Sequence, residues 1–189
     1  MSEGNTPSQT VGPYFSIGFS WITRADLTRG TESGELVTIR GRVLDGEGQP
    51  VPDACLEIWQ ADGQGRYAQA EDSLEKMEAK RFWGFGRVPT NQQGEFSFTT
   101  LRPGPVPGPD GRLQAPHLVI SVFMRGLLER LITRMYFPVE SGEATDAILE
   151  LVPRARRKTL IARAGGAGNN LFDWDVCLQG EQETVFFDC

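Results

Sequence analysis

Histidine is almost absent from this chain, whose 189 residues contain only one, His117. Cysteine is also scarce: Cys55, Cys177 and Cys189 are spaced like neither a disulfide framework nor a CxxC metal site. We expect these cysteines to be thiols in a reducing compartment. A metal site built from the chain's own imidazoles and thiolates is therefore disfavoured, because such sites gather several of these ligands.

Long hydrophobic runs and an excess of basic charge are missing too. No stretch of about 18 apolar residues occurs, the length that a membrane-spanning helix needs. No apolar region typical of a secretory signal follows the polar start, so we expect a cytoplasmic protein. A net charge of −6 disfavours a nucleic-acid partner, because phosphate binding needs clustered basic residues. The one basic cluster, 154–158, fits a solvated or subunit-contact loop, with a site for an acidic ligand as the alternative.

The residues that are present indicate an all-β domain preceded by an arm. We expect residues 1–35 to form an irregular, subunit-contacting arm, whose aromatics need the domain or another chain to cover them. Over residues 36–189, short alternating apolar and polar runs separated by glycine and proline turns predict a mostly antiparallel β-sandwich. The clearest runs lie at 37–43, 54–59, 95–99, 117–123, 131–137 and 174–178.

Only two segments have the pattern of a helix. The first, 72–80, is short and laced with charges. The second, 146–151, can begin from a cap at Thr145 or Asp146 and must end before Pro153. The glycine-rich run 164–168 follows no strand-then-helix pattern, so a flexible surface loop is favoured over a phosphate-binding loop.

Six short blocks follow one another along nearly the whole chain. They are 6–15, 52–61, 65–67, 85–90, 115–117 and 178–188. No single block is decisive, but the ordered set resembles the intradiol ring-cleaving dioxygenase family. The resemblance implies that family's fold and its chemistry, in which O₂ opens a catechol ring between the two hydroxyl-bearing carbons.

The resemblance also implies a ferric iron site, for which the family uses two tyrosines and two histidines. Ferric iron is a hard cation that phenolate oxygen suits. Tyr67 matches the first tyrosine and His117 the first histidine, but Val106 and Val119 stand at the other two ligand positions. Gln114 stands where the family commonly has an arginine. We therefore expect a filled, vestigial pocket without metal, with an unanticipated ligand set as the alternative.

Some members of the family are built from two related chains, one of which holds the iron. This chain resembles the other, an alpha chain. The resemblance implies a homologous beta chain that holds Fe(III), within a higher hetero-oligomer. The implied reaction is the O₂-dependent cleavage of 3,4-dihydroxybenzoate to 3-carboxy-cis,cis-muconate, in the β-ketoadipate pathway of aromatic catabolism. This chain would line the active site of its partner and be inactive alone.

Two regions are candidates for that lining role. One is the arm turn at Thr10, Gly12 and Pro13, which can line the partner's pocket or only pack at the interface. The other is Arg134, which can hold the substrate's ring carboxylate or form an ion pair between subunits. Two further functions stay open. One is a self-sufficient dioxygenase with a divergent site, which the single histidine disfavours, and the other is a β-sandwich binding module without catalysis.

Overall fold

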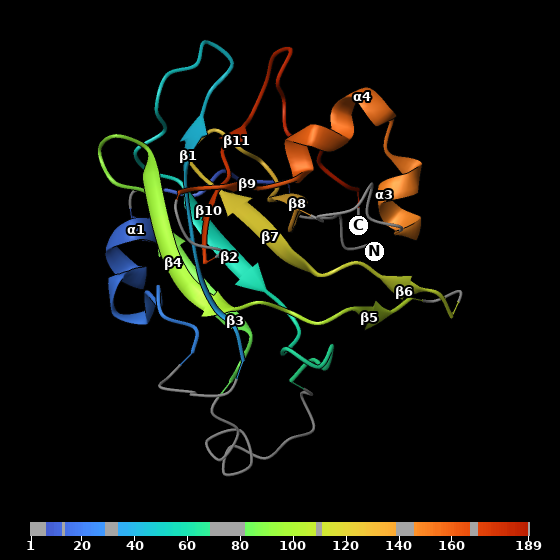
Figure 1. Cartoon of the computed structure of the whole chain (residues 1–189). Coiled ribbons are helices and arrows are strands. Elements are labelled where there is room, and N and C mark those ends of the chain that lie inside the picture. The colour runs from blue at the N-terminus through green and yellow to red at the C-terminus, as the bar shows by residue number, and fades with distance from the viewer. Residues whose placement is uncertain are drawn as a thin grey trace, which may run out of the picture.

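Two β-sheets pack face to face around one hydrophobic core (Figure 1). The computed structural model describes residues 7–12, 14–28, 34–68, 82–108, 111–138, 146–166 and 170–188. The five-stranded sheet contains β1 (Leu36–Leu44), β4 (Glu95–Leu101), β9 (Arg163–Ala164), β10 (Leu171–Asp173) and β11 (Val176–Cys177). The four-stranded sheet has the order β3 (Phe85–Pro89), β2 (Cys55–Trp59), β7 (His117–Phe123) and β8 (Leu131–Tyr136). A two-stranded ribbon joins β5 (Val106–Pro107) to β6 (Leu113–Gln114).

Strand pairing is mostly antiparallel, as predicted. Among the described strands, only β10 and β11 run parallel to β1. The alternation in β7 fixes which side chains enter the core. Leu118, Ile120 and Val122 point into it and are fully buried, while His117 and Val119 lie on the opposite face of the sheet. Burying each aliphatic side chain contributes roughly 1.5–3 kcal/mol to folding, so this register is strongly favoured.

The helices are short and lie outside the sandwich. They are α1 (Tyr14–Phe19), η1 (Ser20–Ile22), α3 (Ala147–Leu151), α4 (Arg154–Arg157) and η2 (Lys158–Leu160). None of the described helices is long and apolar enough to cross a membrane.

The helix predicted at 146–151 is confirmed, and Asp146 is its N-cap. The helix predicted at 72–80 lies outside the described residues. Two expectations of irregular structure were wrong. Part of the arm is helical, as α1 and η1, and the basic cluster 154–158 forms α4 and the start of η2 instead of a loop. Pro153 precedes α4 with its φ fixed at −51°, which pre-organises a helical start that the charge pattern alone does not reveal.

Two turns, at residues 62–66 and 102–105, are hydrogen-bonded to each other beyond the end of β2. The amide of Gly104 donates to the carbonyl oxygen of Asp62 at 2.9 Å. Asp62 in turn accepts the amides of Gln64 and Arg66 at 2.8 and 3.0 Å, which closes the first turn. Gly104 fits because it has no side chain: a Cβ there would lie 2.6 Å from the carbonyl oxygen of Gly63 and 2.8 Å from the amide nitrogen of Gly65.

Replacing Gly104 by alanine should therefore push the two turns apart. We expect Gly104→Ala to lower the free energy of unfolding by about 1–3 kcal/mol, the cost of overpacking against rigid backbone. Gly18→Ala is the matched control, because a Cβ at Gly18 meets nothing within 4 Å. Urea unfolding followed by circular dichroism measures both variants. Equal stability of the two would contradict this account of the turns.

Candidate functional site

The four positions that the family resemblance assigns to metal ligands lie around one end of the four-stranded sheet. The two hydrogen-bonded turns lead directly into Tyr67 and Val106. His117 and Val119 lie two residues apart on one face of β7. The ring of Tyr67 stacks on that of Trp59, with centroids 5.9 Å apart and planes 7° apart. Because Trp59 pairs with Val119 across β2 and β7, this stack brings Tyr67 to the same face of the sheet.

Arg134 lies among these four positions. It pairs with Val119 across β7 and β8. Its Nη1 donates to Oε1 of Gln114 at 2.7 Å, and Gln114 is the partner of Val106 in the β5–β6 ribbon. The positive charge of Arg134 also acts on Tyr67, where it opposes the effect of burial on the phenol pKa. The guanidinium of Arg134 thus acts on Tyr67 and His117, and its residue pairs with Val119 on the neighbouring strand.

His117 is buried, with 2% of its surface exposed. Its Nδ1 lies 2.8 Å from the carbonyl oxygen of Ala115. Since a carbonyl only accepts, Nδ1 carries the proton in this contact. Burial lowers the pKa of His117 below its ordinary value, and the charge of Arg134 lowers it further. The imidazole is therefore held neutral in a fixed tautomer.

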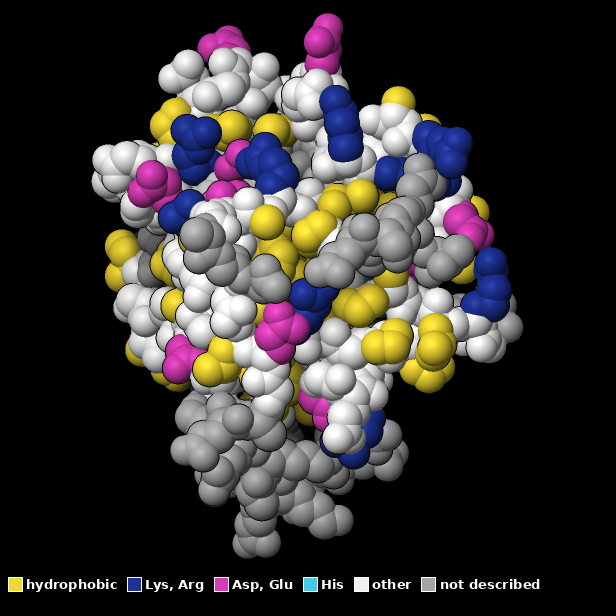
Figure 2. Space-filling view, in the orientation of Figure 1, with side chains coloured by type: hydrophobic (Ala, Val, Ile, Leu, Met, Phe, Trp, Pro, Cys, Tyr) yellow, Lys and Arg dark blue, Asp and Glu magenta, His cyan; other side chains and the backbone are white. Residues whose placement is uncertain are grey.

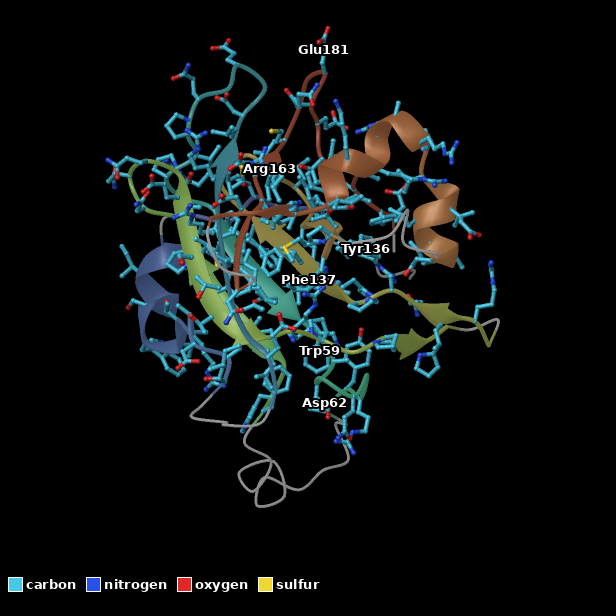
Figure 3. The ribbon with its side chains drawn as sticks, viewed as in Figure 1. Trp59, Asp62, Tyr136, Phe137, Arg163 and Glu181 are labelled. Carbon is cyan, nitrogen blue, oxygen red and sulfur yellow. The ribbon has the colours of Figure 1, made fainter. Side chains whose placement is uncertain are left out.

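A second polar chain joins Arg134 to α3. Nη1 of Arg134 lies 3.5 Å from the hydroxyl of Tyr136, which donates to Oδ1 of Asp146 at 3.2 Å. Asp146 also accepts the amides of Ile148 and Leu149 at the start of α3, and that of Ala115 just before His117. Burial and the carboxylate of Asp146 raise the pKa of Tyr136 to about 12. Figure 3 places Tyr136 between the sheet and α3, away from Trp59 at the other side of the site.

These residues do not fit a ferric ion. Val106 and Val119 offer no donor atom, so two of the four ligands that the resemblance implies are missing. The guanidinium of Arg134 adds a positive charge at the same place. Among the described residues, no three His, Cys, Asp or Glu side chains gather in a way that could hold a metal ion. The chemistry of the site is that of a polar cluster around the positive charge of Arg134.

The other predicted lining residues lie elsewhere on the sandwich. Thr10 accepts, through Oγ1, a 2.7 Å hydrogen bond from the amide of Gly126 in the β7–β8 turn. Gly12 and Arg125 line a hollow of about 360 Å³, and Arg125 pairs with Asp53 at its edge. Pro13 lies outside the described residues.

The structure therefore brings Thr10 to Gly126 and Gly12 to the hollow lined by Arg125, at the turn of the β7–β8 hairpin. Arg134 lies toward the open end of the same hairpin. Sequence reasoning missed Arg125. The only signal for it is its position directly before Gly126, between two predicted strands.

The burial of His117 makes the stability of the fold depend on pH. In the folded state its pKa lies below the ordinary 6.5, so below about pH 6.5 the unfolded chain binds more protons. His117 thus costs the folded state nothing at higher pH and destabilises it progressively as the pH falls through this range. Since the chain has one histidine, proton NMR of the imidazole gives this pKa without assignment.

We expect an imidazole midpoint below 6.5 in the folded chain. In urea unfolding at about pH 8 and about pH 5.5, His117→Gln should lose less stability on acidification than the unsubstituted chain. A midpoint at or above that of free imidazole, or the same loss in both chains, would contradict a neutral buried His117.

Comparison with known proteins gives this geometry its context. A family model described as Dioxygenase matches residues 11–180. A protocatechuate 3,4-dioxygenase alpha chain from Pseudomonas putida is 41% identical over 197 residues, which cover 97% of this chain and 96% of that protein. A protocatechuate 3,4-dioxygenase beta chain from Burkholderia cepacia is 34% identical, over 86% of this chain and 72% of that one.

A solved structure agrees with these relatives. It is the dioxygenase domain of a dioxygenase carbohydrate-binding protein fusion from Streptomyces sp. SirexAA-E, with a TM-score of 0.64 at 25% identity. The match covers 86% of this chain and 89% of that domain. The chain therefore belongs to the intradiol dioxygenase family.

Proposed function

We propose that this chain is the alpha subunit of a protocatechuate 3,4-dioxygenase, holds no iron itself and completes the active site of an iron-bearing beta chain. The observation that carries the proposal is the pocket around Arg134, where two ligand positions are valine and a guanidinium lies among all four. The similarity to a protein named as an alpha chain supports it. The substrate would be protocatechuate (3,4-dihydroxybenzoate), opened by O₂ in the cytoplasm as part of aromatic catabolism.

The arm is the proposed contact with the beta chain. Ile17 and Trp21, in α1 and η1, are 66% and 81% exposed, so their large apolar surfaces face outward. Phe15 anchors the arm, since its ring lies 5.7 Å from that of Phe123 on β7. An exposed tryptophan held on an anchored segment is typical of a protein interface. On the face shown in Figure 2, Lys and Arg lie among Asp and Glu, which suits a protein partner better than nucleic acid.

The arm turn is the proposed contribution to the partner's substrate pocket. Thr10 accepts a hydrogen bond from the amide of Gly126, and one hollow is lined by Gly12, Arg125 and Asp53. Protocatechuate carries a ring carboxylate, which a guanidinium at the rim of the pocket would attract. We therefore propose that Arg125 attracts this carboxylate, with Thr10 and Gly12 in the neighbouring arm turn. The predicted role of Pro13 falls outside the described residues. Both guanidiniums are bonded within the chain, Arg125 to Asp53 and Arg134 to Gln114. The prediction that Arg134 holds this carboxylate stays a prediction.

Two other functions compete with this one. A self-sufficient dioxygenase would need a metal site of its own, and the donor set around Arg134 does not supply one. A β-sandwich binding module without catalysis would share the fold, the valines and the exposed arm. Whether this chain forms an active complex with an iron-bearing beta chain distinguishes a subunit from a binding module.

Reconstitution provides that test. The chain should be purified alone and together with an iron-bearing beta chain, and each sample analysed for iron, visible tyrosinate-to-iron absorption and protocatechuate cleavage. We expect the chain alone to be colourless and inactive, and the complex to be coloured and active. Stoichiometric iron in the chain alone would refute the proposal. A chain that forms no active complex with an iron-bearing homologue would favour the binding module.

Arg125 gives a narrower prediction for the complex. Arg125→Ala should raise the KM for protocatechuate about tenfold, the loss expected for one hydrogen bond to a charged group. Cleavage of a catechol without a carboxylate should change much less. Arg130→Ala is the control, because Arg130 is an exposed arginine in the same β7–β8 connection. Equal effects on both catechols, or on both variants, would remove Arg125 from the carboxylate site.

A further inference from the structure

Arg134 is held in place by bonds to its own chain and is not a freely moving surface arginine. Gln114 accepts from Nη1 at 2.7 Å, and the hydroxyl of Tyr136 lies 3.5 Å from the same nitrogen. Tyr136 is fully buried and its hydroxyl is bonded to Asp146, which is 1% exposed and caps α3. The guanidinium is thus anchored through β6, β8 and α3, and its position follows from the fold.

Arg134 is also linked to both valines of the incomplete ligand set, to Val119 by strand pairing and to Val106 through Gln114. Val119 is its partner across β7 and β8. Val106 pairs with Gln114, the residue that accepts its hydrogen bond. Tyr67 reaches the same face through its stack on Trp59, the partner of Val119 on the other side. A cation bound between Tyr67, His117 and these two strand positions would lie next to the guanidinium.

We propose that Arg134 takes the place of a metal in this chain, as a fixed cation that excludes ferric iron by repulsion in addition to the missing ligands. The repulsion matters because a partly buried pocket screens charge poorly. Restoring the two ligands would then leave the pocket unable to hold iron tightly while the charge of residue 134 remains. The repulsion acts among the chain's own residues and is independent of the contacts that the chain makes with a beta chain.

The test restores the ligands with and without the charge. Val106→Tyr and Val119→His are combined in the full chain, first alone and then with Arg134→Met or Arg134→Lys. Methionine and lysine are unbranched side chains of similar length, and only lysine keeps the positive charge. Iron binding is measured by metal analysis and by titration of the tyrosinate-to-iron absorption. We expect the methionine variant to bind ferric iron at least about tenfold more tightly than the lysine and arginine variants.

Equal affinity of the lysine and methionine variants would overturn the proposal, because the charge would then have no effect. Tight binding by the chain that keeps Arg134 would overturn it as well. Circular dichroism and thermal unfolding establish that each variant folds. Where the tyrosine disrupts the fold, Val119→His alone provides a milder version, since it places two histidines on one face of β7.

In that milder version, Zn²⁺ is the probe, and calorimetry compares Val119→His with Arg134→Met against Val119→His with Arg134→Lys. The methionine variant should again bind more tightly, by a similar factor. Equal Zn²⁺ affinity of the two variants would contradict exclusion by charge, as equal ferric affinity would.

Discussion

The hydrogen-bonded path from Arg134 to Asp146 connects the elements around the candidate pocket. Arg134 lies on β8 and donates to Gln114 on β6, and Tyr136 on the same strand donates to Asp146. Asp146 then fixes the start of α3 and the residues that lead into β7. Buried polar groups of this kind are costly unless each finds a partner, so the path has one arrangement that satisfies all its members. The position of the guanidinium therefore follows from the packing of β6, β8 and α3.

The two ends of the β7–β8 hairpin have different roles in this account. At the open end, Arg134, Tyr67 and His117 form a pocket whose charge opposes a metal. At the turn, Thr10 binds Gly126 and Arg125 faces the hollow of the arm. In the proposed function, the first end accounts for the need for a catalytic partner, and the second offers a surface for that partner. One end of the hairpin thus carries the incomplete ligand set, and the other lines an open hollow with the Arg125–Asp53 ion pair.

Sequence patterns predicted the sandwich well because its strands alternate cleanly. β7 covers the expected run 117–123, and α3 begins at the expected cap, Asp146. The family resemblance also allowed the incomplete ligand set, Tyr67, Val106, His117 and Val119, to be identified from the sequence alone. The position of Arg134 could not, because it depends on the register of β7 against β8 and on Gln114 in a separate ribbon. Arg125 was missed for the same kind of reason, since its neighbour Gly12 is more than a hundred residues away in the chain. The helical part of the arm is too short for periodicity to reveal.

The central claim is that catalysis by this protein uses iron held outside its own pocket. Anomalous X-ray scattering at the iron edge, from crystals of the chain assembled with an iron-bearing beta chain, tests this most directly. The account predicts one iron site per pair of chains, coordinated only by the beta chain, with no peak between Tyr67, His117 and Arg134. An iron peak bonded to Tyr67 or His117 of this chain would contradict it.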